Sequence, residues 1–114
     1  MDVVTALFAA LNARDVDGAI ACSAPGVDWP DALAGTRVRG RDAVRAYWRA
    51  QWAAVALDLH PRLMRQLPDG RVEVLVEQVV RDTDGDLLSR AVVLHIYTFA
   101  GPLVHRMDVG DPQA

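Results

Sequence analysis

The stretch from Val27 to Trp48 constrains the fold more than any other part of this 114-residue chain. Val27 and Trp29 alternate with Asp28, which predicts a short strand. A glycine-marked turn and a second short strand follow, and Gly40-Arg-Asp then opens an amphipathic helix with an acid favourable to the helix dipole in its first turn. We therefore predict a short hairpin that leads directly into a helix.

Two short helices are expected before this stretch. Apolar side chains from Val4 to Leu11 recur at helical spacing and predict an amphipathic helix over residues 2–13. Asp15 is a good N-cap for a second short helix. Ala24-Pro25-Gly26 is expected to end that helix, because proline and glycine are the strongest local helix breakers.

The hydrophobic period changes to two after Ala56, which predicts four strands. A bulge or bend is expected in the first of them, near His60-Pro61. Short helices followed by a run of antiparallel strands are typical of an α+β domain. A chain of this length has room for one core, so residues 1–114 are expected to form a single domain. The predicted strands are 56–67, 71–82, 87–100 and 103–110.

The predicted strand 87–100 is apolar on both of its faces. Antiparallel sheets with one wet face show polar residues there, so this sheet should be covered on both sides. Helices can cover one side, and a second copy of the chain is the economical cover for the other. We expect a homodimer packed through the sheet. One face carries Val93, His95, Tyr97 and Phe99, and the other carries Val92, Leu94, Ile96 and Thr98.

Charge and cysteine content indicate the compartment and exclude some partners. The net charge of −3 argues against a protein that binds nucleic acid or a membrane surface. All 12 basic residues are arginine, which we interpret as codon bias in a GC-rich bacterium. The single Cys22 fits a reducing cytosol, and neither a membrane span nor a signal peptide is expected. We predict a cytoplasmic protein.

No metal or cofactor is expected. His60 and His105 have no neighbour at the spacing of a zinc motif. The chain also contains no phosphate-binding loop, dinucleotide fingerprint or nucleophile elbow, which argues against a nucleotide cofactor.

The chain resembles the nuclear transport factor 2-like superfamily, especially its ketosteroid isomerase and SnoaL-like polyketide cyclase branches. The resemblance implies a curved antiparallel sheet, wrapped by three N-terminal helices into a cone around a deep pocket. This is a cystatin-like α+β roll, and it implies a small apolar or polycyclic ligand and a homodimer. The resemblance is carried by Leu11-Asn-Ala-Arg-Asp15-Val-Asp-Gly, Val27-Asp-Trp-Pro-Asp31, Gly40-Arg-Asp-Ala-Val-Arg-Ala-Tyr-Trp48 and Leu103-Val-His-Arg-Met-Asp108-Val.

The resemblance also implies site residues. An early strand aspartate is the base in the isomerases, and Asp31 stands at that position. Their second oxyanion donor falls on His95, whereas their first-helix tyrosine donor falls on Leu7, which has no proton to give; this argues against steroid isomerisation. SnoaL-like cyclases use an acid–base aspartate on the last strand, near the location of Asp108. The implied catalytic residues are Asp31, His95 and Asp108.

Each of these residues also has a structural interpretation. A carboxylate of Asp31 that faces an apolar cavity suits a general acid or base, but a turn aspartate would instead bond to local backbone. The strand alternation predicts that His95 faces the cavity, either as a donor or as a buried neutral imidazole. Arg106 and Asp108 share a face with Val104, where they form either a ligand-binding pair or a structural ion pair.

Aromatic residues complete the predicted site. Trp29, Tyr47, Trp48, Tyr97 and Phe99 are expected to line the pocket beside Arg106, although aromatic residues at such spacing are more often core. Two functions follow from this set. The first is a cofactor-independent isomerase, cyclase or hydrolase that uses aspartate acid–base chemistry on an apolar substrate. The second is a non-catalytic ligand-binding or dimeric accessory domain.

Overall fold

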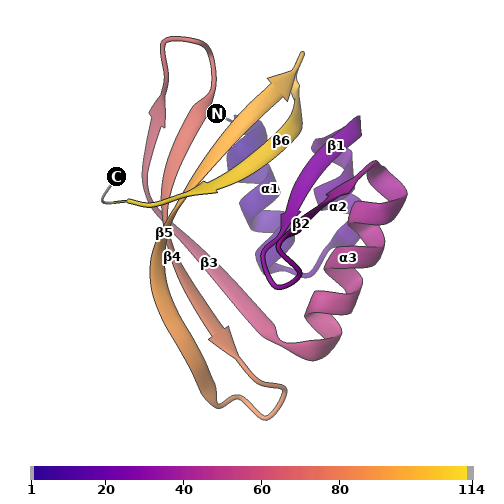
Figure 1. Ribbon diagram of the computed structural model, residues 1–114, viewed down its shortest axis with the longest axis vertical. Coiled ribbons are helices and arrows are strands. Elements are labelled where there is room, and N and C mark those ends of the chain that lie inside the picture. Colours follow the sequence, from indigo (N-terminus) through magenta and orange to yellow (C-terminus); the bar gives the residue numbers. More distant parts are fainter. Residues whose placement is uncertain (1, 113–114) are drawn as a thin grey trace.

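The computed structural model describes residues 2–112 and has the α+β architecture predicted from the sequence. A strongly curved sheet lies on one side of the molecule, and the helices lie on its concave side (Figure 1). The helices are α1 (Asp2–Asn12), α2 (Val16–Ala21) and α3 (Arg41–Ala54). The strands are β1 (Ser23–Asp31), β2 (Thr36–Arg39), β3 (Ala56–Gln66), β4 (Val72–Arg81), β5 (Leu87–Ala100) and β6 (Leu103–Gly110).

The sheet has six strands in the order β2-β1-β6-β5-β4-β3. Strands β3 to β6 form the predicted antiparallel meander, and β1 and β2 form the predicted hairpin. The sequence did not predict that β1 would pair parallel with β6. This pairing joins the N-terminal hairpin to the meander and makes one continuous curved sheet.

The end of α2 differs from the expectation. The helix begins after the predicted cap, since Asp15 accepts a hydrogen bond from the Gly18 backbone N–H at 3.0 Å. It ends at Ala21, however, and Ala24-Pro25-Gly26 lies inside β1. The strand can contain Pro25 because its register with β6 is irregular between Ser23 and Asp28, so no regular ladder bond is lost there.

A register shift interrupts each of the three strand pairings of the meander. The register of β3 against β4 shifts between Pro61 and Leu63, which confirms the irregularity predicted near His60-Pro61. In β6, Val104 lies opposite Phe99 and Arg106 lies opposite Thr98, so His105 is an extra residue. A bulge reverses the alternation of side chains along its strand. The bulge at His105 therefore decides which residues of β6 face the core.

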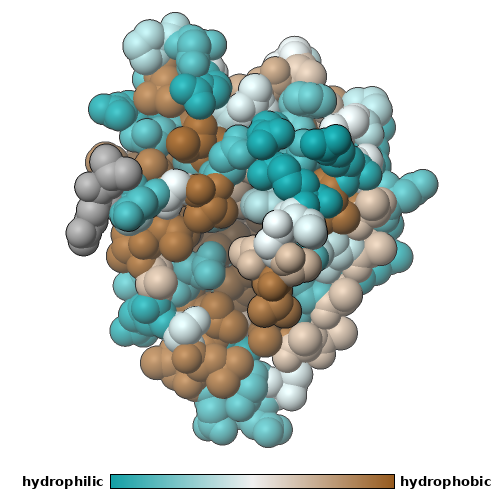
Figure 2. Space-filling model, viewed as in Figure 1, coloured by the Kyte–Doolittle hydropathy of each residue, from teal (hydrophilic) through white to brown (hydrophobic). Residues whose placement is uncertain are grey.

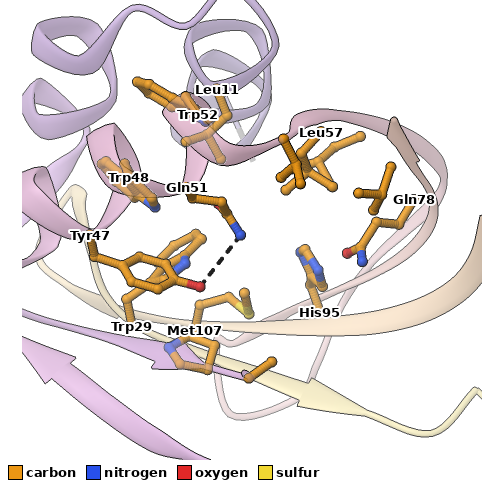
Figure 3. Close-up of a pocket in the computed structure, with 15 residues that line it drawn as sticks. Leu11, Trp29, Tyr47, Trp48, Gln51, Trp52, Leu57, Gln78, His95 and Met107 are labelled. Carbon is orange, nitrogen blue, oxygen red and sulfur yellow. Dashed lines mark hydrogen bonds between the residues drawn. The ribbon is translucent and has the colours of Figure 1, made fainter. Parts of the chain in front are cut away.

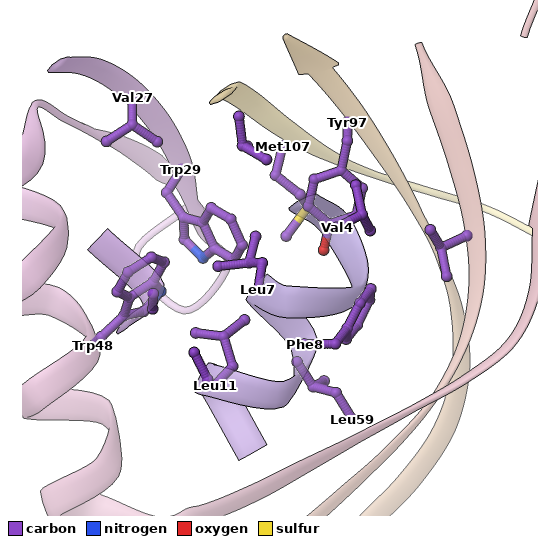
Figure 4. Packing of buried hydrophobic residues seen from close by; sticks show 14 of the residues in the cluster. Val4, Leu7, Phe8, Leu11, Val27, Trp29, Trp48, Leu59, Tyr97 and Met107 are labelled. Carbon is purple, nitrogen blue, oxygen red and sulfur yellow. The ribbon is translucent and has the colours of Figure 1, made fainter. Parts of the chain in front are cut away.

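The core lies between α1 and the concave face of the sheet (Figure 4). Leu7 of α1 points toward Trp29 of β1, and the rings of Phe8 of α1 and Tyr97 of β5 meet edge to face at 6.0 Å. Trp29 of β1 meets Trp48 of α3 edge to face, with ring centroids 5.1 Å apart. These buried side chains anchor α1 and α3 and thereby fix the walls of the site described below.

The convex face of the sheet remains apolar and open to solvent. Val92 is 50% exposed and Leu63 is 67% exposed, and within the described chain no helix lies on this side (Figure 1). Both faces of β5 are therefore apolar, as the sequence indicated. None of the helices in residues 2–112 has the length and apolar run needed to cross a membrane.

Candidate functional site

A cavity of about 160 Å³ lies between α3, the C-terminal end of α1 and the concave face of the sheet (Figure 3). In the space-filling view, apolar side chains surround a hollow between the meander strands and the β1–β2 turn (Figure 2). Most of the walls are aromatic or aliphatic, and the few polar groups lie at two ends. The lining residues are Leu11, Trp29, Pro30, Ala32, Tyr47, Trp48, Gln51, Trp52, Val55, Leu57, Leu59, Gln78, Val80, His95 and Met107.

His95 forms the polar end on the sheet side of the cavity, where Gln78 lies beside it (Figure 3). Its ring stacks on Phe8, with centroids 6.0 Å apart and planes 12° apart. Burial lowers the pKa of His95 to about 4, because desolvation penalises the imidazolium. The side chain is therefore a neutral imidazole at neutral pH, as one of the two sequence interpretations held.

The tautomer of His95 follows from its one partner. Nδ1 lies 3.0 Å from the hydroxyl oxygen of Tyr97, whose side chain is fully buried, and burial raises the pKa of Tyr97 far above its usual range. A phenol O–H is a stronger acid than a neutral imidazole N–H, so we assign the hydroxyl as the donor and Nδ1 as the acceptor. Nε2 then carries the hydrogen. It has no hydrogen-bond partner within residues 2–112, so it is available to the cavity.

Tyr47 and Gln51 form the opposite polar end, one turn apart on α3 (Figure 3). The Gln51 amide donates to the Tyr47 hydroxyl oxygen at 3.4 Å, which leaves the tyrosine O–H free to donate elsewhere. Burial raises the pKa of Tyr47, and the nearby Asp31 charge raises it further. The Tyr47 hydroxyl is therefore protonated at neutral pH and acts as a donor.

Asp31 lies at the C-terminal end of β1 and does not line the cavity. Its Oδ1 accepts a hydrogen bond from the Ala34 backbone N–H at 3.1 Å, which is the local turn interaction that the sequence left as the alternative. The residue instead borders an open groove that shares Tyr47 with the cavity. The lining set of the cavity, taken from the described residues, contains no carboxylate.

Arg106 and Asp108 point away from the cavity. The sequence placed them on one face with Val104, but the bulge at His105 separates Val104 from that face and turns Met107 inward instead. Val104 and Met107 are buried, whereas the Arg106 and Asp108 side chains are 39% and 37% exposed. Arg106 Nε donates to Asp108 Oδ2 at 2.9 Å, so the ion pair that was one of the two alternatives is present.

This pair belongs to a larger charge cluster on the convex face, which we call the arginine cluster (Asp28, Arg37, Arg39, Arg106 and Asp108). Arg37 donates to Asp28 through Nε and to Asp108 through Nη1, the latter at 3.2 Å. Arg39 and Arg106 donate to Asp28 at 3.2 Å and 3.1 Å. The cluster joins β2, β1 and β6, and it lies across the sheet from the cavity.

Asp28 is the centre of the arginine cluster, and sequence reasoning did not select it. It is 7% exposed, and its burial opposes ionisation. The hydrogen bond from Arg37 and the charges of Arg37, Arg106 and Arg39 outweigh that effect and lower the pKa of Asp28. The alternation of Asp28 with the inward-facing Trp29 was the available signal, because it already placed this carboxylate on the outer face.

The predicted aromatic residues divide into two groups. Trp29, Tyr47 and Trp48 line the cavity, as expected. Tyr97 is fully buried behind the cavity wall, where it contacts the lining residues His95 and Trp29, and Phe99 borders a separate surface depression near Gly101. The sequence did not select the polar lining residues Gln51 and Gln78. Gln78 could have been found from the sequence, because it lies two residues from both Val76 and Val80 and therefore shares their apolar face of the strand.

Metal-ligating side chains are not grouped in the part of the chain that the structure describes. Among residues 2–112, no set of three histidine, cysteine, aspartate or glutamate side chains comes close enough to hold an ion. The polar groups that reach the cavity include two amides, one hydroxyl and one imidazole, all of which bind organic polar groups by hydrogen bonds.

Comparison with known proteins identifies a family. The model of the SnoaL-like domain matches residues 4–107. No curated protein sequence matches the chain significantly.

Solved structures with the same fold cover nearly the whole chain. An NTF2-like protein of unknown function from Burkholderia pseudomallei is 24% identical, with a TM-score of 0.83, over 97% of this chain and 88% of its own. Rv0760c from Mycobacterium tuberculosis, in complex with estradiol-17beta-hemisuccinate, is 17% identical, with a TM-score of 0.83, over 94% and 88%. TerC, co-crystallised with polyporic acid, is 20% identical, with a TM-score of 0.82, over 98% and 90%. At these identities the likeness shows the fold.

Proposed function

We propose that this chain, which belongs to the SnoaL-like domain family, binds a small and mostly apolar ring compound in the cavity between α3 and the sheet. One observation carries the proposal. Neutral hydrogen-bonding groups stand at both ends of an apolar cavity, with His95 Nε2 at one end and the Tyr47 hydroxyl at the other. Such a site suits a neutral ligand with an acceptor such as a carbonyl or hydroxyl oxygen.

The size of the cavity supports a compact ligand. Its volume of about 160 Å³ is close to that of an engineered protein cavity of about 150 Å³ that binds benzene. One ring therefore fits without rearrangement of the walls. The complexes of Rv0760c with estradiol-17beta-hemisuccinate and of TerC with polyporic acid support a small organic ligand for this fold as well.

Phenol and toluene test the proposal, because they have almost the same shape and differ in one hydroxyl group. Trp29, Trp48 and Trp52 line the cavity, so ligand entry is expected to change tryptophan fluorescence in a saturable manner. Replacing His95 by phenylalanine should lower the ratio of phenol to toluene affinity roughly tenfold, the effect of one lost hydrogen bond of about 1.4 kcal/mol. An absence of saturable binding by either compound would contradict the proposal.

A second candidate function is proton transfer by Asp31. The observation that favours it is the position of this carboxylate beside Tyr47, a residue of the cavity wall. A ligand carbon held near Tyr47 could lose a proton to Asp31 while the tyrosine hydroxyl donates to the adjacent oxygen. The chain would then be a cofactor-independent isomerase, cyclase or hydrolase. Replacement of Asp31 by asparagine should abolish turnover and spare binding.

We further propose that the chain forms a homodimer through the convex face of the sheet. Exposed apolar side chains on β3 (Leu63) and β5 (Val92) support this arrangement, because water-exposed apolar surface of this kind is normally covered. A cytoplasmic location is proposed from the single Cys22, which is free and half-buried.

A further inference from the structure

A second apolar depression adjoins the cavity. This groove of about 580 Å³ lies between the β1–β2 turn and the C-terminal half of α3. Ala32, Tyr47, Gln51 and Val55 belong to the walls of both, so the two spaces meet at the Tyr47–Gln51 pair. A molecule that fills the cavity can therefore extend past this pair into the groove.

The groove is built from one stripe of α3. Tyr47, Ala50, Gln51 and Ala54 recur at intervals of three and four residues, which places them on one side of the helix. Leu33, at the tip of the β1–β2 turn, forms the opposite wall and is 100% exposed. The small side chains of Ala50 and Ala54 leave a channel beside Leu33 that the described part of the chain does not fill.

The charge at the groove limits what can occupy it. Asp31 is the charged residue in its lining, and one of its oxygens is already bonded to the Ala34 N–H. A carboxylate at this place repels an anionic occupant, because two like charges at close range disfavour each other. The apolar walls favour a neutral aliphatic group.

We propose that the ligand has two parts, a ring held in the cavity and a neutral flexible alkyl chain that lies in the groove along Ala50 and Ala54. This inference rests on the proposed function, since the ring must first bind in the cavity. It deepens that function by naming the ligand class as ring compounds with an apolar tail. The continuity of the two spaces, through the four shared residues, is the observation that selects a tail over any other occupant.

A series of 4-alkylphenols, from phenol to 4-hexylphenol, tests the inference by titration of tryptophan fluorescence. The affinity should rise about fourfold for each methylene group that the groove buries. Ala54→Asp places a charge in the groove and should lower the ratio of 4-hexylphenol to phenol affinity at least tenfold. Ala53→Asp is the matched control, because Ala53 is the neighbouring exposed residue of α3 and is outside the groove lining. It should leave that ratio unchanged.

The outcomes separate the two proposals. If phenol does not bind to the native chain, the proposed function fails and the tail site fails with it. If phenol binds but the ratio is the same in Ala54→Asp and Ala53→Asp, the cavity is functional and the tail site is wrong. A change in sedimentation mass in Ala54→Asp alone, with an unchanged affinity ratio, would place a second copy of the chain in the groove and would also overturn the inference.

Discussion

The hydroxyl of Tyr97 lies 3.0 Å from Nδ1 of His95, and both side chains are buried between the sheet and α1. Each group is the other's hydrogen-bond partner within the described chain. This relationship leaves Nε2 as the atom that His95 presents to the cavity. The hydrogen bond also stabilises the fold, because a buried polar atom without a partner is costly.

Replacement of Tyr97 by phenylalanine should therefore destabilise the fold. The change removes one hydroxyl and leaves Nδ1 of His95 buried without a partner, which costs about 1–3 kcal/mol. Urea denaturation measures this loss. Tyr47→Phe is the matched control and should cost less, because the hydroxyl of Tyr47 has only a long bond of 3.4 Å to Gln51. Equal losses in both variants would contradict the assigned role of Tyr97.

The stability of the protein should fall as pH falls from about 6.5 toward 4. The pKa of His95 is 6.5 in the absence of structure and about 4 in the fold, because burial disfavours the imidazolium. Between these values the unfolded chain binds a proton that the folded chain does not, so acid favours unfolding, by up to ~3 kcal/mol. Above pH 6.5 neither state is protonated and this contribution vanishes.

Urea denaturation at several pH values checks this expectation. His95→Phe should show a shallower fall in the free energy of unfolding between pH 6.5 and 4, because the titrating group is absent. His60→Phe is the matched control for the loss of a histidine, since His60 is exposed. The same slope in the native chain and in His95→Phe would show that His95 is not held neutral by burial.

Strand alternation was enough to predict which way His95 points, and the sequence also marked the Asp15 cap and the irregularity at Pro61. These features depend on residues that lie within a few positions of one another. The period of a strand and the chemistry of a cap or a proline act locally, so one sequence reveals them.

The arginine cluster and the orientation of Asp108 were not predictable in this way. The bulge at His105 has no glycine or proline to mark it, and a shift of one residue moves every later side chain to the other face. The bond from Arg106 to Asp28 joins residues 78 positions apart, through a parallel pairing of β1 with β6 that depends on the whole fold.

Loss of the Asp28 carboxylate should destabilise the N-terminal hairpin. Asp28→Asn would leave Arg37, whose side chain is 24% exposed, without its charged partner in β1. Because the arginines of the cluster are partly solvated, we expect the free energy of unfolding to fall by about 1–3 kcal/mol. This is less than the cost of breaking a fully buried ion pair. Asp108→Asn should cost less, since that carboxylate is 37% exposed.

The same two variants also test the separation of the cluster from the cavity. Phenol affinity should be unchanged in Asp28→Asn and Asp108→Asn under conditions where both are folded, because the cluster lies across the sheet from the ligand. A large loss of phenol binding in Asp108→Asn alone would instead favour a direct role of this residue in the site.

If the chain forms the proposed dimer, a charge placed on the convex face of the sheet should change its molecular mass in solution. Val92, which is 50% exposed on the outer side of β5, would lie between two copies of the sheet. Val92→Asp should convert the dimer to a monomer in sedimentation equilibrium, because a two-fold interface presents the buried charge twice. Leu33→Asp is the control, since Leu33 is fully exposed on the β1–β2 turn and away from that face, and it should keep the dimer mass. A native chain that sediments as a monomer at micromolar concentration would show that the apolar convex face remains open to water in solution.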